Sequence, residues 1–222
     1  MNAIIITGAG TGLGRELALQ YSHKEITTIV IGRTESTLKE TQTLIRELGC
    51  SSEYFVCDIK DPSSVKEVIH HVCSLYTVTM LINNAGIGHF GELETMDDHL
   101  IEEIIQTNII GTIYMSKYIL PYLKKQPKSK LMNIISTAGL RGKVNESVYC
   151  ASKFAVRGFT ESLYKELEST PISVSAVYMG GMDTPFWDDS NHVKDKSRLR
   201  SAKLIAEQIF KEDDGRLEIH IR

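Results

Sequence analysis

The feature that most constrains the fold is a glycine-rich turn placed directly after a short apolar run near the amino terminus. The run Ile4–Ile6 leads into the letters TGAGTGLG at residues 7–14, and an amphipathic stretch follows. Glycines at such a turn permit a tight bend and let the backbone approach a pyrophosphate at the start of a helix, where N–H groups face an anion. A purely structural tight turn is the alternative, but the position between a strand and a helix favours dinucleotide binding.

The rest of the chain alternates short β-branched runs with longer amphipathic stretches, which is typical of βαβ units that build a parallel sheet. Strands are predicted at Ala3–Thr7, Thr27–Ile31, Glu53–Cys57, Met80–Asn83, Lys130–Ser136, Ile172–Val177 and Leu217–Ile221. Helices are predicted at Leu13–Ser22, Glu35–Leu48, Ser63–Leu75, Asp97–Leu123, Tyr149–Glu168 and Ala202–Phe210. With right-handed crossovers, this order predicts an α/β fold, a doubly wound three-layer sandwich with helices on both faces of the sheet.

Length and composition favour a single domain over residues 1–222, because no Pro- or Ser-rich linker divides the chain. The formal net charge is −3 and no basic stripe is present, so nucleic acid is not an expected partner. The apolar run Ile4–Ile6 is too short for a signal peptide or a membrane span, and we expect a cytoplasmic protein without membrane contact. The cysteines lack the spacing of a zinc site or a disulfide framework, so we expect reduced thiols and no metal at Cys50, Cys57, Cys73 and Cys150.

The end of the second predicted strand bears on the choice of cofactor. An NAD-preferring site usually places an acidic residue there against the ribose hydroxyls, whereas this chain has Gly32 and Arg33. Gly32 leaves room for a 2′-phosphate, and Arg33 can bind it through charge-assisted hydrogen bonds. An ordinary exposed arginine is the alternative for Arg33. We therefore expect NADP(H) in preference to NAD(H), and we expect Arg15 to be a solvated helix residue and not a second phosphate contact.

A group of polar residues carries the predicted chemistry. Tyr149 and Lys153 lie one turn apart on a predicted helix, so their side chains share a face. A phenol is a poor base at neutral pH, and a neighbouring ammonium group would lower its pKa by favouring the phenolate. Ser136, at the end of the fifth strand, can hold a substrate oxygen, and Asn108, in the long helix, can anchor a water that relays protons to Lys153. Each residue alone has an ordinary structural alternative, but together with the glycine turn they predict a catalytic site.

Over nearly its whole length the chain resembles the short, single-domain branch of the short-chain dehydrogenase/reductase family. The resemblance is carried by the TGAGTGLG turn, by Asn83-Asn84-Ala85-Gly86, and by Tyr149-Cys150-Ala151-Ser152-Lys153 preceded by Asn108 and Ser136. It implies an oxidoreductase that passes hydride between a nicotinamide and an alcohol or carbonyl substrate. By this resemblance Asn108, Ser136, Tyr149 and Lys153 are the catalytic residues, with Tyr149 as general acid/base and Lys153 also holding the nicotinamide ribose.

The resemblance also implies a set of cofactor contacts. Asp58 and Ile59 match the pair at the adenine ring, and Thr184 matches the threonine at the carboxamide. The full expected set is Gly8, Gly10, Thr11, Gly12, Leu13, Gly14, Arg33, Asp58, Ile59, Asn84, Ala85, Gly86, Tyr149, Lys153, Gly180 and Thr184. Met179 stands before Gly180 where the family has proline, and we expect a looser turn at an entropic cost of about 0.4–1 kcal/mol.

Family members usually form dimers or tetramers through the two long helices, so a homodimer or homotetramer is expected. A protein that binds NADP without chemistry is the main alternative function, but it would leave the intact Tyr149 and Lys153 unexplained. A nucleotide-sugar epimerase would need a larger carboxyl-terminal substrate domain, and a structural protein would leave the catalytic set without a role.

Substrate identity does not follow from the sequence. The predicted pocket comes from Gly88–Leu93, Leu140–Val148 and Asp183–Arg200, which lack a diagnostic charge arrangement. Its apolar residues either line a pocket or pack the cap: Phe90, Leu140, Val144, Phe186 and Trp187. The segment Asp183–Arg200 is either a lid or a solvated loop, and its position after a strand favours the lid.

Overall fold

A seven-stranded parallel sheet forms the centre of the molecule, as the strand pattern predicts. The computed structural model describes residues 1–188, 190 and 192–221. Within them the strands run in the order β3-β2-β1-β4-β5-β6-β9, and every neighbouring pair is parallel. The strands are β1 (Asn2–Thr7), β2 (Ile26–Gly32), β3 (Ser51–Val56), β4 (Thr77–Asn83), β5 (Ser129–Ile134), β6 (Ile172–Tyr178) and β9 (Glu218–His220).

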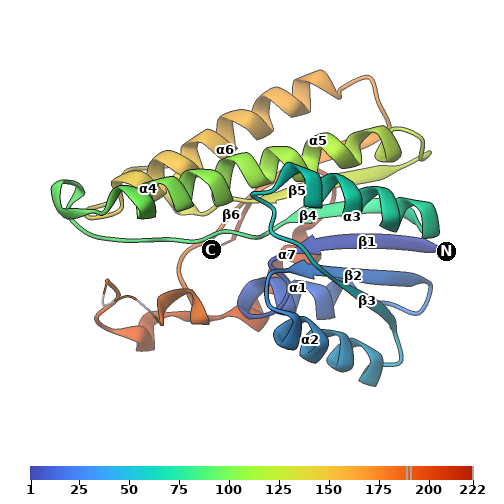
Figure 1. Ribbon diagram of the computed structural model, residues 1–222, viewed down its shortest axis with the longest axis horizontal. Coiled ribbons are helices and arrows are strands. Elements are labelled where there is room, and N and C mark those ends of the chain that lie inside the picture. The colour runs from blue at the N-terminus through green and yellow to red at the C-terminus, as the bar shows by residue number, and fades with distance from the viewer. Residues whose placement is uncertain (189, 191, 222) are drawn as a thin grey trace.

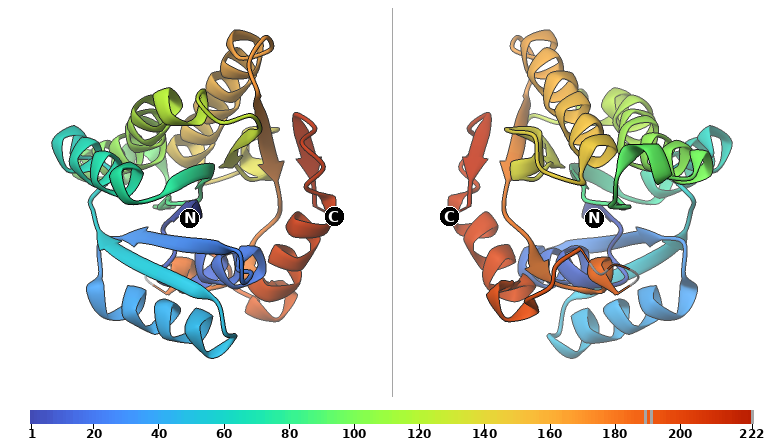
Figure 2. Two further views of the ribbon diagram at one scale, coloured as in Figure 1. Left: turned by 90° about the vertical axis from the view of Figure 1, so that its right-hand side faces the viewer. Right: turned by 90° about the vertical axis from the view of Figure 1, so that its left-hand side faces the viewer.

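Helices cover both faces of this sheet (Figures 1 and 2). One face carries α1 (Gly12–Tyr21), α2 (Glu35–Glu47) and α7 (Ala202–Glu212), and the other carries α3 (Pro62–Leu75), α4 (Asp98–Ile104), α5 (Thr112–Leu123) and α6 (Ser147–Glu166). Each layer has its own buried core. Leu17, Leu38 and Ile205 pack against the first face of the sheet, and Ile69, Ile119 and Leu163 against the second. Because both faces are covered, the strands are apolar along nearly their whole length.

The strand order reverses direction between β1 and β4. From β1 the chain adds β2 and β3 on one side, then returns to β4 and adds β5, β6 and β9 on the other. At such a switch point the loops after the two central strands diverge and leave a crevice at the carboxyl edge of the sheet. The fold therefore places the glycine turn after β1 and Asn83-Asn84-Ala85-Gly86 after β4 at the same edge.

The long helix predicted at Asp97–Leu123 is present as an unbroken helical stretch from Asp98 to Leu123, but it is not regular throughout. Between α4 and α5 the residues Ile105–Gly111 form a π-helical segment with a widened turn. The run is rich in β-branched residues, which favour the α-helix weakly, and Gly111 packs closely on Ile59, where an added Cβ would lie 2.6 Å from the Ile59 side chain. Asn108 lies inside this segment. Widened turns of this kind occur frequently at functional sites.

The described residues of the segment Asp183–Arg200, which leave out residues 189 and 191, lie at the carboxyl edge of the sheet and are drawn in orange in Figure 1. It contains the short strand β7 (Met182–Asp183), a turn of 3-10 helix at Pro185–Trp187, and β8 (Arg200–Ser201), which pairs with β7 in parallel. Trp187 is buried and its indole N–H donates to the carbonyl oxygen of Met182 at 2.9 Å. This part of the segment is therefore packed against the domain and is not a solvated loop.

No helix among the described residues combines the length and the apolar character that crossing a membrane requires.

Candidate active site

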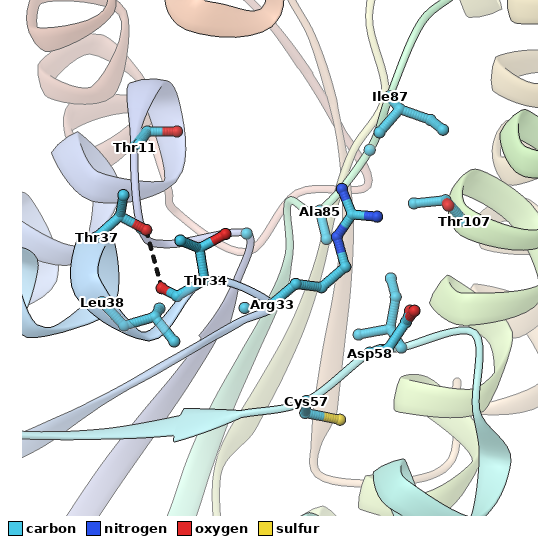
Figure 3. Close-up of a pocket in the computed structure, with 15 residues that line it drawn as sticks. Thr11, Arg33, Thr34, Thr37, Leu38, Cys57, Asp58, Ala85, Ile87 and Thr107 are labelled. Atoms are coloured by element: carbon cyan, nitrogen blue, oxygen red, sulfur yellow. Dashed lines mark hydrogen bonds between the residues drawn. The ribbon is translucent and has the colours of Figure 1, made fainter.

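A cleft opens at the switch point between β1 and β4. Many of the residues that line it were predicted from the sequence as cofactor contacts: Gly8, Gly10, Thr11, Arg33, Asp58, Ile59, Ala85 and Gly86. Other lining residues were not predicted from the sequence, among them Thr34, Thr37, Cys57, Ile87 and Thr107. Figure 3 shows that these side chains come from several strand ends and from the start of α2. Their convergence depends on strand order, so no local sequence signal identifies them.

The glycine turn is shaped by its contacts with the loop after β4. Gly8 has a φ of +63°, and a Cβ there would lie 2.8 Å from the Cα of Ala85. The side-chain amide of Asn84 donates to the carbonyl oxygens of Thr7 at 3.0 Å and Gly8 at 3.3 Å. The Thr7 hydroxyl in turn accepts from the backbone N–H groups of Asn84 and Ala85, both at 3.0 Å. The two loops therefore form one rigid wall of the cleft.

Arg15 fastens the glycine turn to α2, which corrects its expected role as a solvated residue. Its guanidinium donates to the carbonyl oxygen of Gly10 at 2.5 and 3.0 Å and to the Thr41 hydroxyl at 3.0 Å. It also forms an ion pair with Glu40 at 2.8 Å. The five donors of the guanidinium suit a site where several acceptors converge. Arg15 thus stabilises the turn from behind.

Arg33 directly follows β2 and extends into the cleft (Figure 3). The residue is exposed, and among the residues that the structure describes it forms no ion pair. Beside it, Thr34 caps the amino terminus of α2 without a side-chain hydrogen bond to the helix. An unpaired guanidinium next to a helix amino terminus is an arrangement that attracts an anion.

A buried polar atom in the cleft tests whether a dinucleotide fits. Thr107 is 7% exposed, lines the cleft, and its hydroxyl has no hydrogen-bond partner among the described residues. A buried hydroxyl without a partner costs free energy, so such a group indicates a polar ligand. The cleft is also lined by the backbone of Gly8 and Gly10, without side chains that would block a charged group at the turn. The residues present therefore fit a dinucleotide such as NADP(H).

Asn108 connects the π-helical segment with the other parts of the site. Its Oδ1 accepts from the backbone N–H of Ile87 at 2.8 Å, and its Nδ2 donates to the carbonyl oxygen of Ile87 at 2.9 Å. The same Nδ2 donates to the hydroxyl of Ser152 at 3.0 Å, which donates to the carbonyl oxygen of Tyr149 at 2.7 Å. Protein groups therefore engage both ends of the side-chain amide, and it joins the cleft to α6.

Ser136 lies just beyond the end of β5 and has a strained backbone. Its φ is 133°, a region that non-glycine residues rarely adopt, and its hydroxyl accepts from the backbone N–H of Ala138 at 3.2 Å. The unusual backbone places the serine at the start of a 3-10 turn, Thr137–Gly139, which packs on α6 beside Lys153. Such strain is retained where the surrounding structure imposes it, which is common at functional sites.

Tyr149 and Lys153 are both buried on α6, with the Lys153 Nζ 5.7 Å from the Tyr149 ring centroid. Burial raises the pKa of the Tyr149 phenol well above its ordinary value, the Ser136 hydroxyl opposes this, and the charge of Glu146 adds to it. Burial lowers the pKa of Lys153 to about 8. Lys153 is not among the groups that shift this pKa, so the expected lowering of the Tyr149 pKa by Lys153 is not seen in the protein alone, where desolvation of the phenolate dominates.

Lys153 connects the other predicted catalytic residues with the cleft. Its Nζ donates to the carbonyl oxygen of Ile134 at 3.2 Å, which holds the side chain beneath the end of β5. A Cβ on Gly86 would lie 3.5 Å from this Nζ and 3.3 Å from the Oδ1 of Asn108. The loop after β4 thus borders the cleft on one side and the group Asn108, Lys153 and Tyr149 on the other.

The remaining predicted contacts occupy different places. Thr184 lies against the glycine turn, where a Cβ on Gly12 would be 3.2 Å from its side chain. The side chain of Leu13 packs in the core beneath the turn, and Gly180 is exposed, with nothing within 4 Å of an added Cβ. Met179 is buried in the same core as Leu13, and its carbonyl oxygen accepts from the N–H of Thr137 at 2.9 Å. The expected looseness of its turn stays a prediction.

Comparison with known proteins agrees with this arrangement. Residues 2–195 match the family model described as short chain dehydrogenase. The chain is 35% identical to the 3-ketodihydrosphingosine reductase of Bacteroides thetaiotaomicron, over 92% of this chain and 76% of that protein. It is 28% identical to the sepiapterin reductase of Chlorobaculum tepidum, over 83% and 79% of the two chains. An actinorhodin polyketide ketoreductase variant, solved with NADPH, superimposes with a TM-score of 0.89 at 26% identity, covering 99% of this chain and 95% of that one.

Proposed function

The chain belongs to the short-chain dehydrogenase family, and from this membership we propose that it is an NADP(H)-dependent oxidoreductase with Tyr149 as its general acid/base. Members of this family act on alcohol or carbonyl groups, so the chain is an enzyme of that class. The finer assignments rest on one observation. The fold brings Asn108, Ser136, Tyr149 and Lys153 together from three elements, the π-helical segment, the turn after β5 and α6, next to a cleft that fits a dinucleotide.

Each of the four side chains has a different role in the reduction of a carbonyl group. When bound, the nicotinamide cofactor supplies the hydride that reaches the carbonyl carbon. Tyr149 donates its phenolic proton to the carbonyl oxygen, while the Ser136 hydroxyl, which already interacts with that phenol, holds the same oxygen. Lys153 in its protonated form stabilises the phenolate that remains. Asn108 keeps Ile87 and Ser152 in place, and through Ser152 it supports the backbone of Tyr149.

The preference for NADP(H) is proposed from the end of the cleft near α2. Arg33 is unpaired among the described residues, the hydroxyl-bearing Thr34 and Thr37 line the same end, and the amino terminus of α2 lies beside them. Glu35, the acidic residue in the first turn of α2, is paired with Lys39 at 2.9 Å and accepts from the Tyr54 hydroxyl at 2.9 Å. The negative charge of Glu35 is thereby partly compensated, so it repels a phosphate at this position less strongly.

Replacing Arg33 by Ala should weaken NADPH binding by about tenfold or more, because a hydrogen bond to a charged group is lost. NADH lacks the 2′-phosphate, so its dissociation constant should hardly change. Fluorescence titration of both cofactors measures the effect. Arg46→Ala is a suitable control, because Arg46 is exposed and pairs with Glu53 outside the cleft. Equal losses for the two cofactors would show that Arg33 does not distinguish them.

Replacing Glu146 by Gln should move the pH profile of turnover to lower pH. The Glu146 charge raises the pKa of the Tyr149 phenol, so its removal lowers that pKa. In carbonyl reduction Tyr149 must be protonated, and the rate falls as pH rises through its pKa. The fall should therefore begin at lower pH in the variant, measured with saturating cofactor. Glu166→Gln, at the exposed end of the same helix, should leave the profile in place. If the pH profile of Glu146→Gln did not move, the group whose titration limits turnover would not be Tyr149.

The function as a whole is tested by titrating the purified protein with NADPH and NADH, and then assaying ketones, aldehydes and quinones with the cofactor that binds. NADPH binding with turnover of any member of the panel supports the proposal. The absence of binding to either cofactor would overturn it, whereas binding with no turnover across a broad panel would favour an NADP-binding protein without chemistry.

A homodimer or homotetramer and a cytoplasmic location remain predictions. The large exposed side chains Phe154 and Tyr164 on α6 support assembly through that helix, since apolar groups at such positions are commonly covered by a second subunit.

A further inference from the structure

An aromatic wall faces the predicted general acid/base. It consists of Phe90 from the loop after β4 together with Phe186, Trp187 and His192 from the segment after β7. The Tyr149 ring contacts Phe90 at 5.5 Å and Phe186 at 5.8 Å between centroids. Phe90 in turn stacks on Trp187 at 5.1 Å and on the His192 imidazole at 4.7 Å, with interplanar angles of 23° and 18°. The substrate side of Tyr149 is therefore covered by rings from two separate loops.

His192 attaches this wall to the start of α6. Its Nε2 lies 3.0 Å from the Oε1 of Glu146, which directly precedes α6 and is only 7% exposed. The other oxygen of that carboxylate is 3.7 Å from the Nζ of Lys143. A buried carboxylate is costly without a partner, so the imidazole is the contact that best compensates it. The hydrogen bond thereby connects the wall to the helix that carries Tyr149.

Two sets of contacts together fix the position of the His192 side chain. The imidazole stacks on Phe90 and at the same time binds Glu146, so its position is defined by both. Without this hydrogen bond the His192 edge of the wall would be held mainly by ring contacts, which are individually weak and tolerate sliding, whereas Trp187 would keep its bond to the Met182 carbonyl oxygen. These rings contact the Tyr149 ring directly, so a carbonyl substrate that reaches the phenol must pass beside them.

We propose that His192 is a positioning residue: through Glu146 and Phe90 it holds the aromatic wall against Tyr149 and so determines how the substrate fits beside the phenol. This inference rests on the proposed function for its effect on the substrate, but its structural part stands independently of turnover. His192 does not contact the dinucleotide cleft, whose lining is formed by other residues. Its loss should therefore affect the substrate and leave the cofactor unaffected.

The single tryptophan of the chain provides a direct readout. Trp187 belongs to the wall and is 9% exposed, so acrylamide quenching of its fluorescence reports whether the wall stays packed. His192→Ala should increase this quenching severalfold, whereas His192→Gln, which can still donate to Glu146, should remain close to the wild type. His23→Ala, at an exposed histidine outside the site, is the matched control and should not change it. Thermal unfolding establishes that each variant is folded.

The kinetic test separates positioning from general damage. With NADPH saturating, His192→Ala should raise the KM for the carbonyl substrate severalfold, because the rings beside Tyr149 are no longer held in one position. The NADPH dissociation constant should stay unchanged, and His192→Gln should restore the KM. Unchanged Trp187 quenching in a folded His192→Ala variant would overturn the proposal. If the wild type shows no turnover, the proposed function fails, but the quenching experiment still decides whether His192 holds the wall.

Discussion

Tyr149→Phe should reduce turnover by about 10²–10⁴-fold, the range typical of losing a general acid/base. The change removes only the phenolic oxygen. The ring, with its contacts to Phe90 and Phe186, is retained, so the pocket should keep its shape. The variant should stay folded with at most a modest loss of stability, because the Ser136 hydroxyl loses its interaction with the phenol. Cofactor binding should change little. The measurement is kcat with saturating NADPH and the best carbonyl substrate, together with the NADPH dissociation constant.

The control for this change is Tyr164→Phe, on the same helix but at a partly exposed position. It should keep full activity. Turnover of Tyr149→Phe within a few-fold of the wild type would exclude the phenol as the proton donor. Lys153, whose pKa of about 8 lies within the working range of a proton donor, would then be the next residue to test.

Gly14→Ala should destabilise the protein by about 3 kcal/mol, at the upper end of what overpacking costs. Gly14 lies in the first turn of α1, where an added Cβ would collide with the carbonyl oxygen of Gly8 and lie 2.5 Å from the side-chain amide of Asn84. The first contact is backbone and cannot rotate away. The glycine turn would have to shift from the loop after β4, so NADPH binding should weaken as well. Denaturant unfolding and cofactor titration measure the two effects.

Gly158→Ala supplies the comparison. This glycine is also helical, on α6, but nothing lies within 4 Å of an added Cβ. The substitution should stabilise the protein by roughly 0.5–1 kcal/mol, because alanine loses less backbone entropy than glycine in a helix. If Gly14→Ala proved as stable as the wild type, the close approach of α1 to the loop after β4 would not be what requires a glycine at residue 14.

Much of the fold could be predicted because its signals are local. Each strand of the large sheet is a short β-branched run, and the structure confirms all seven of the predicted strands with boundaries that shift by a few residues. The glycine turn and the Tyr149-to-Lys153 spacing are local in the same sense. They depend on the backbone freedom of glycine and on the helical period, which neighbouring residues determine.

Some local features differ from the prediction because distant residues impose them. The helix from Asp97 to Leu123 widens around Asn108, whose amide binds the backbone of Ile87 from another loop. Arg15 is directed inward because acceptors on Gly10 and on the α2 residue Thr41 converge on it. Helical periodicity alone does not show which partners a side chain meets across the fold.

The sequence by itself determined the α/β architecture and the order of the motifs along the chain, and it supplied the residues that we propose as catalytic. Only the tertiary structure decided the environment of those residues. Tyr149 is buried because Phe90 and Phe186 reach it from loops far apart in the chain, and this burial reverses the expected direction of its pKa shift. Thr107 and His192 also acquire their roles in this way. The reason is physical: desolvation and hydrogen-bond satisfaction depend on every group within a few ångströms, whichever part of the chain supplies it.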